Sequence, residues 1–125
     1  MMRTSPFRGA ESTDLEALAR LERFGGRTLL NEMIALYLES APERLAAAAA
    51  GLVASDAAAT ENALHSLKAS SAQLGAVRLS RLCEEGEAIA RTGTLLRIAD
   101  VIEASRTELR LVEAWLEGVR AERPT

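Results

Sequence analysis

The stretch ALHSLKASSAQLG, residues 63–75, has the pattern of an amphipathic helix and contains the only histidine of the chain. At about 100° per residue, Leu64, Leu67 and Leu74 fall on one face of such a helix. His65 falls on the opposite face. Because the apolar face should pack against other helices, we expect the imidazole to lie in water, where another molecule can reach it.

The side chains nearest His65 on this outward face are small or charged. They stand three, four or seven residues away and are Glu61, Lys68, Ala69 and Ala72. A lone exposed histidine is most often an ordinary surface residue. Any assignment of function therefore depends on what surrounds it.

Two further helices are predicted after this stretch. Gly75 ends the first helix, and a second helix is expected over residues 76–91, ended by the run Thr92-Gly93-Thr94. The last helix has core positions that alternate spacings of four and three: Ile98, Ile102, Ser105, Leu109, Val112, Leu116 and Val119. This spacing is typical of a helix packed nearly parallel or antiparallel to its neighbours.

Upstream, a long helix is predicted over residues 27–50 and a short one over residues 13–23. Pro42 interrupts the long helix, which either bends there, as we favour, or divides into two segments. Thr13 or Ser12 is expected to cap the short helix, and Asp56 the central one. The run Phe24-Gly25-Gly26 should end the short helix.

The composition agrees with an all-α protein. Of 125 residues, 48% are hydrophobic but only 3% aromatic, and no stretch alternates apolar and polar residues as a strand would. Short connections make consecutive helices antiparallel neighbours. We predict an up-down-up-down four-helix bundle over residues 13–121 with the short helix at one end, a loosely attached segment at 1–12, and a flexible tail at 122–125.

Several classes of function find no support in the sequence. The net charge is −3 and the basic residues form no block, which argues against nucleic-acid binding. No signal peptide or membrane span is apparent, so we expect a cytoplasmic protein. One histidine and Cys83, which we expect in the core, offer no cluster of metal ligands. No glycine-rich phosphate cradle is present, which argues against independent use of ATP.

If the helices on either side of Gly75 form a hairpin, residues equally far from the turn lie at the same height. His65 then faces Gly86, with Glu87 and Arg91 close by, in a stripe at the border of the apolar face of the second helix. A carboxylate at Glu87 could accept a hydrogen bond from Nδ1–H of His65 and leave Nε2 as the nucleophile. Lys68 could stabilise negative charge on Nε2. Gly86 indicates close packing, clearance beside the histidine, or simple tolerance.

The run HSLKASSAQLGAVRLSRLCEEGE, residues 65–87, resembles the signature of histidine-containing phosphotransfer (HPt) domains of bacterial two-component phosphorelays. The resemblance extends over about residues 13–120. It implies a four-helix bundle that is not an enzyme and whose His65 accepts a phosphoryl group from a receiver-domain aspartate and passes it to another receiver. It also implies that Lys68 is the adjacent cation, that Glu87 orients the ring, and that Arg91 adds a charge one turn later.

The expected partners are response regulator receiver domains and a hybrid sensor kinase, with the chain itself a monomer without a cofactor. The Mg²⁺ for the transfer is expected on the receiver. The docking residues that we predict are Glu61, Ala69, Ala72, Gln73, Glu84 and Arg91. Ala69 departs from the family pattern, because many members have glycine there, and we expect a modest effect on docking.

Two other functions remain open from the residues alone. The same outward face could serve a helical interaction module that binds a signalling partner without phosphorylation. A small helical hydrolase is the weaker alternative, because no pair of nucleophile and base is evident.

Overall fold

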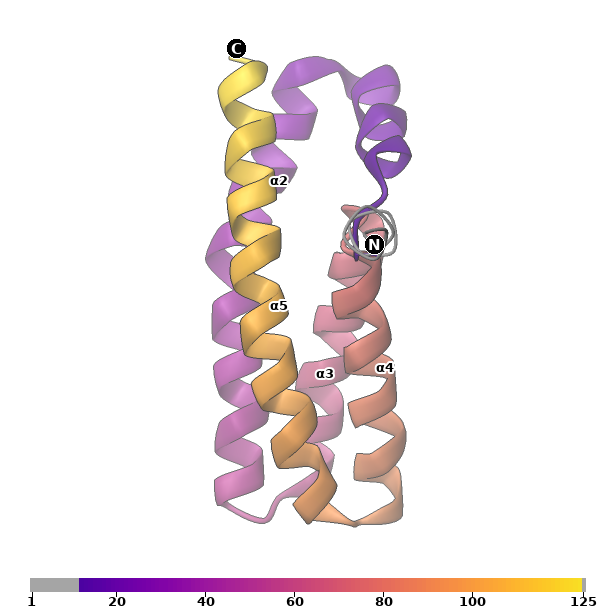
Figure 1. Cartoon of the computed structure of the whole chain (residues 1–125), viewed down its shortest axis with the longest axis vertical. Helices are drawn as coiled ribbons and strands as arrows, with labels where there is room; N and C mark the ends of the chain where they lie inside the picture. The colour runs from indigo at the N-terminus through magenta and orange to yellow at the C-terminus, as the bar shows by residue number, and fades with distance from the viewer. Residues whose placement is uncertain (1–11, 125) are drawn as a thin grey trace, which may run out of the picture.

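The computed structural model describes residues 12–124, and every regular element in that range is an α-helix (Figure 1). The helices are α2 (Leu15–Val53), α3 (Ala57–Gln73), α4 (Val77–Thr92) and α5 (Leu95–Glu122). Both α2 and α4 pack on α3 and α5, which closes the bundle. Consecutive helices run antiparallel, which confirms the predicted four-helix bundle. The predicted loose segment at residues 1–12 lies outside the described residues except for Ser12.

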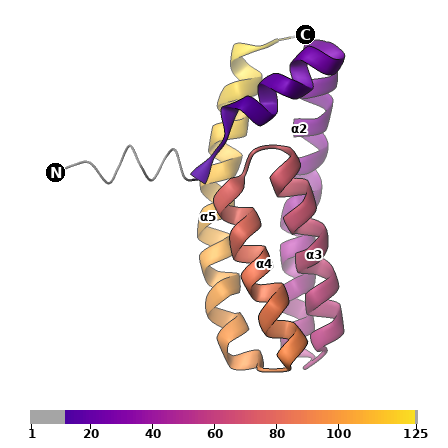
Figure 2. The ribbon, with the colours of Figure 1, turned by 90° about the vertical axis from the view of Figure 1, so that its right-hand side faces the viewer.

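The first turns of α2 form the predicted short helix. Backbone angles inside α2 depart from helical values at Gly26, where φ is 80°, so the chain changes direction there. The cap predicted at Thr13 or Ser12 is wrong, because the side chain of Asp14 accepts the hydrogen bond from the Glu16 amide. Figure 2 shows this short segment crossing the end of the bundle above the α3–α4 turn. The sequence predicted it at one end of the bundle.

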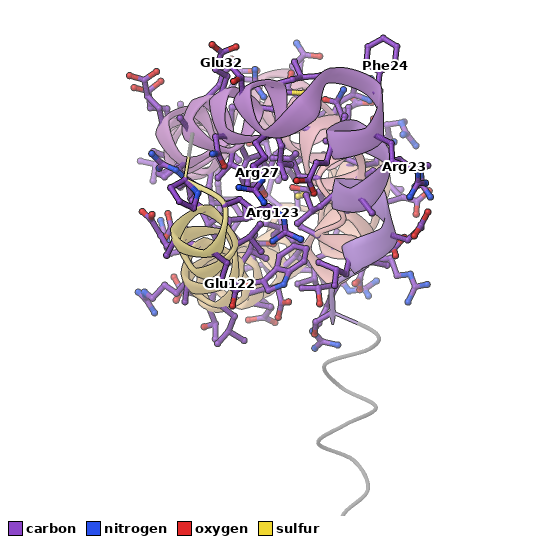
Figure 3. All side chains as sticks on the ribbon, turned by 90° about the horizontal axis from the view of Figure 1, so that it is seen from above. Arg23, Phe24, Arg27, Glu32, Glu122 and Arg123 are labelled. Carbon is purple, nitrogen blue, oxygen red and sulfur yellow. The ribbon has the colours of Figure 1, made fainter. Side chains whose placement is uncertain are left out.

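Two contacts fasten the short segment to that end. The amide of Asp14 donates to the carbonyl of Gly75 at 2.7 Å. Nε of Arg123, after the end of α5, donates to Oε1 of Glu22 at 3.1 Å. In the view from above, Phe24 points away from the bundle (Figure 3), and it is 87% exposed. The short segment therefore holds the α3–α4 turn and the end of α5 without burying Phe24.

Beyond Gly26, α2 continues through Pro42 to Val53. Helical angles persist at Pro42, so the alternative of two separate segments there is wrong. A proline removes one backbone hydrogen bond, here the one to the Leu38 carbonyl. Pro42 lies on the exposed face of α2, where water can take the place of the missing donor. A bend at this position stays a prediction.

The core consists mainly of leucine, isoleucine, valine and alanine. All seven positions predicted for the last helix are buried in α5, including Ser105. Thr60 and Ser71 are the polar residues that α3 buries, and the hydroxyl of Ser71 shares a 2.7 Å hydrogen bond with that of Tyr37. Cys83 lies in the core as predicted, and burial raises the pKa of its thiol to about 12. No helix within residues 12–124 is long and apolar enough to cross a bilayer.

Candidate functional site

His65 lies on the outer side of α3, where its side chain is 63% exposed. It is placed there because Leu64 and Leu67, on its two sides in the sequence, are completely buried in the core. Asp56 caps the start of the helix, as the sequence predicted, because its carboxylate accepts a hydrogen bond from the amide of Ala59 at 3.0 Å. Capping and core packing of α3 thus fix the direction in which the imidazole points.

Nδ1 of His65 lies 2.7 Å from Oε2 of Glu87, which α4 places opposite it. The side chain of Glu87 is only 5% exposed, although the sequence placed it at the border of the apolar face. An ionised carboxylate can only accept hydrogen bonds, so this contact assigns the ring proton to Nδ1. The lone pair of Nε2 is then free on the exposed side of the ring.

Glu87 is the centre of a cluster of positive groups. Nζ of Lys68 lies 2.8 Å from Oε1 of Glu87, and Nη2 of Arg91 lies 3.3 Å from Oε2. The close ion pair with Lys68 is the main cause that lowers the pKa of Glu87, assisted by the hydrogen bond from His65, while burial acts in the opposite direction. Glu87 is therefore the charged acceptor that the ring needs at neutral pH.

Arg91 connects this cluster to the preceding turn of α3. Its Nε donates to Oε2 of Glu61 at 2.8 Å, so one guanidinium touches carboxylates on both helices. The predicted residues His65, Lys68, Glu87, Arg91 and Glu61 thus form one connected group.

A groove of about 500 Å³ opens beside His65 between α2 and α3. Its lining includes the predicted docking residues Ala69 and Gln73. The α2 side of the groove is formed by residues for which the sequence analysis predicted no role in docking: Met33, Leu36, Tyr37, Ser40 and Arg44. Leu36 is 64% exposed. The sequence could have indicated it as a docking residue, because it is a large apolar residue that lies off the apolar stripe of its helix.

Two predicted docking residues lie apart from these features. Ala72 and Glu84 are exposed and do not line the groove, and Glu84 forms no ion pair within residues 12–124. Gly86 does not provide clearance beside the histidine. A Cβ at Gly86 would lie 2.7 Å from Cδ1 of Leu64 and 3.1 Å from Cγ1 of Val101, so close packing in the core explains this glycine.

No group of three or more histidine, cysteine, aspartate or glutamate side chains that could hold a metal ion occurs in the described part of the chain. The site consists of an exposed imidazole, a buried carboxylate that fixes its tautomer, and two cations. In a four-helix bundle this arrangement is suited to carrying a group on Nε2.

Comparisons with known proteins agree with a protein that carries a group on a histidine. The Hpt domain family matches residues 32–122, and the chain belongs to this family. Among solved structures, the chain is similar to histidine-containing phosphotransfer protein B (HptB) from Pseudomonas aeruginosa PAO1. The two share 30% sequence identity and a TM-score of 0.87, over 92% of this chain and 99% of that one. A search of curated proteins gave no match. The chain is thus a histidine phosphotransfer intermediate of phosphorelays, as the sequence predicted.

Proposed function

We propose that His65 is the phosphoacceptor and that Nε2 is the atom that carries the phosphoryl group. The observation that supports this most is the 2.7 Å contact between Nδ1 of His65 and the buried carboxylate of Glu87. It holds the ring in one tautomer while the opposite nitrogen stays open to solvent. The donor is an aspartyl phosphate of a receiver domain, and the acceptor is the aspartate of another receiver.

In the forward step, Nε2 attacks phosphorus in line with the aspartyl oxygen. The N–P bond forms as the O–P bond breaks, and the electron pair of the broken bond stays on the aspartate carboxylate. The proton on Nδ1 remains shared with Glu87, so the ring becomes positively charged next to a buried negative charge. Reversal of these events delivers the phosphoryl group to the next receiver.

Lys68 supplies positive charge one turn after His65. Its ammonium is bound to Glu87 and only 27% exposed, so it is held in place rather than free to move. Its positive charge would stabilise the negative charge of the phosphoryl oxygens in the transition state. We assign the Mg²⁺ to the receiver, which then contributes most of the catalysis, so this chain acts as a carrier and not as an enzyme.

We propose the groove between α2 and α3 as the docking surface for receiver domains. Leu36 and Ala69 offer an apolar surface next to His65, and Arg44 adds one cation at its edge. An apolar patch with an acidic neighbour on the receiver would match this chemistry. We further propose that the chain works as a monomer in the cytoplasm and that a hybrid sensor kinase lies upstream of it.

Incubation with phosphorylated receiver domains tests this function. We expect transfer of an acid-labile, base-stable label to the wild-type chain and none to His65→Gln, because glutamine lacks the nucleophilic nitrogen. Thermal unfolding of the variant is the control for folding. Label that persists in His65→Gln would contradict the assignment, and unchanged signalling by that variant in cells would favour a binding module instead.

A further inference from the structure

The ion pair between Arg91 and Glu61 is linked to the proposed phosphoacceptor through Oε2 of Glu87, which contacts both Nδ1 of His65 and Nη2 of Arg91. Arg91 reaches across from α4, with Nε 2.8 Å from Oε2 of Glu61 and Nη2 3.3 Å from Oε2 of Glu87. The side chain of Arg91 is 55% exposed and that of Glu61 is 30% exposed. Lys68, the other cation of the cluster, is bound to Glu87. Arg91 is therefore the more exposed of the two cations near His65.

A phosphoryl group on Nε2 would compete for this guanidinium. It brings close to two negative charges, and a guanidinium pairs with phosphoryl oxygens through two parallel hydrogen bonds. Glu61 opposes such a pairing in two ways. It already binds Nε of Arg91, and it places a negative charge one helical turn before His65.

We propose that Glu61 is a positioning residue that keeps Arg91 from binding the phosphoryl group on His65. This inference rests on the proposed function, because it concerns the stability of phosphorylated His65. A carrier that held its phosphoryl group through a bidentate arginine would release it poorly to the next receiver. By retaining Arg91, Glu61 keeps the phosphoryl-transfer potential of the histidine high.

The test measures the equilibrium of the phosphoryl group between this chain and a receiver domain that labels it. Glu61→Gln keeps the size of the side chain and removes its charge. We expect the ratio of phosphorylated chain to phosphorylated receiver to rise roughly threefold, which is the order of effect of one exposed ion pair. An unchanged or lower ratio would overturn the proposal.

Adding Arg91→Gln separates the proposed mechanism from simple repulsion between Glu61 and the phosphoryl group. In the Arg91→Gln background, Glu61→Gln should change the ratio by about half as much or less, because no guanidinium is left to be released. An equal gain in both backgrounds would overturn the proposal.

The matched control is Glu16→Gln, which breaks another exposed bond between glutamate and arginine. Glu16 binds Nη2 of Arg23 at 2.7 Å on the short segment at the end of the bundle, with side-chain exposures of 57% and 63%. The Glu16→Gln substitution removes the same negative charge as Glu61→Gln, but at a position away from His65. We therefore expect the wild-type ratio of phosphorylated chain to phosphorylated receiver. A gain equal to that of Glu61→Gln would overturn the proposal.

A second readout needs no receiver. Phosphoramidate can phosphorylate histidine directly, as the N–P bond to Nε2 forms and ammonia leaves. We expect phosphorylation to shift the ¹⁵N resonance of Arg91 Nε strongly in Glu61→Gln and weakly in the wild type. Equal shifts would overturn this proposal alone, whereas a wild-type chain that neither phosphoramidate nor any receiver labels would overturn the proposed function itself.

Discussion

Glu87 gives the site its chemical direction. A carboxylate that is 5% exposed is costly to keep charged unless cations and hydrogen-bond donors surround it. Here Lys68 and Arg91 supply the positive charge, and Nδ1–H of His65 supplies a hydrogen bond. Each of these three side chains is held in a fixed orientation by its contact with the Glu87 carboxylate. The ring tautomer and the position of the lysine are therefore consequences of one buried charge.

The stability of the domain should depend on the ionisation of Glu87. Its pKa in the folded chain lies below the ordinary 4.5, so its contribution is fully present above about pH 4.5 and is lost as pH falls through the lowered pKa. Glu87→Gln should cost roughly 2 kcal/mol at pH 7, because the bonds to charged partners weaken.

Urea unfolding at pH 7, 4 and 3 measures this dependence. The stability difference between the wild type and Glu87→Gln should shrink as pH falls, because acid removes from the wild type the charge that the variant already lacks. Other carboxylates titrate equally in both proteins and cancel in this difference. A difference that stays constant from pH 7 to pH 3 would contradict the role given to Glu87.

For single residues, the sequence predicted the neighbours of His65 but not how deeply they are buried. Counting back across Gly75 placed Glu87 beside the histidine, because the rise per residue is the same in both helices of the hairpin. Whether a border residue is covered depends on how closely neighbouring helices approach. The sequence therefore placed Glu87 at the correct level along the hairpin beside His65, but it did not predict that the side chain is buried.

Among the elements, the α3–α4 hairpin carries the site, and its turn depends on Gly75. Gly75 has φ of 79°, and a Cβ there would lie 2.3 Å from the backbone oxygen of Asp14. Gly93, which ends α4, has the same φ but nothing within 4 Å of such a Cβ. Substituting Gly93 therefore tests backbone strain alone, whereas substituting Gly75 tests backbone strain together with a clash against the short segment.

Gly75→Ala should destabilise the domain by about 3 kcal/mol, from the left-handed conformation together with displacement of the Asp14 backbone. Gly93→Ala should cost only about 1 kcal/mol, from the conformation alone. Chemical denaturation of both variants measures the difference. Equal losses would show that the contact between the short segment and the turn adds nothing to stability.

Helix positions followed from periodicity more reliably than helix ends. Every position predicted to face the core from the last helix is buried, because a sustained repeat leaves one consistent face. The first cap was misplaced because Ser12, Thr13 and Asp14 are all good capping residues in succession. Local chemistry does not choose among them, whereas the hydrogen bond from the Asp14 amide to Gly75 fixes where the chain enters the helix.

For the whole molecule, the docking groove belongs to the assembled bundle and not to either helix. Leu36 on α2 and Ala69 on α3 are 33 positions apart and come together only because these helices pack side by side. The α3 half of the surface was therefore predictable from its distance to His65. The α2 half required the angle and register of a second helix.

This arrangement predicts that receivers bind one face of the bundle and not another. Leu36→Asp should weaken receiver binding about tenfold, since an apolar contact near the centre of an interface is replaced by a charge. Leu111→Asp is the matched control, because Leu111 is 60% exposed against 64% for Leu36 and lies on α5, away from the groove. Titration of each variant with an unphosphorylated receiver measures both affinities. Equal weakening would place the receiver elsewhere, because an aspartate on α5, outside the groove, can affect docking in the groove only through long-range charge, which salt at physiological strength screens beyond about 8 Å.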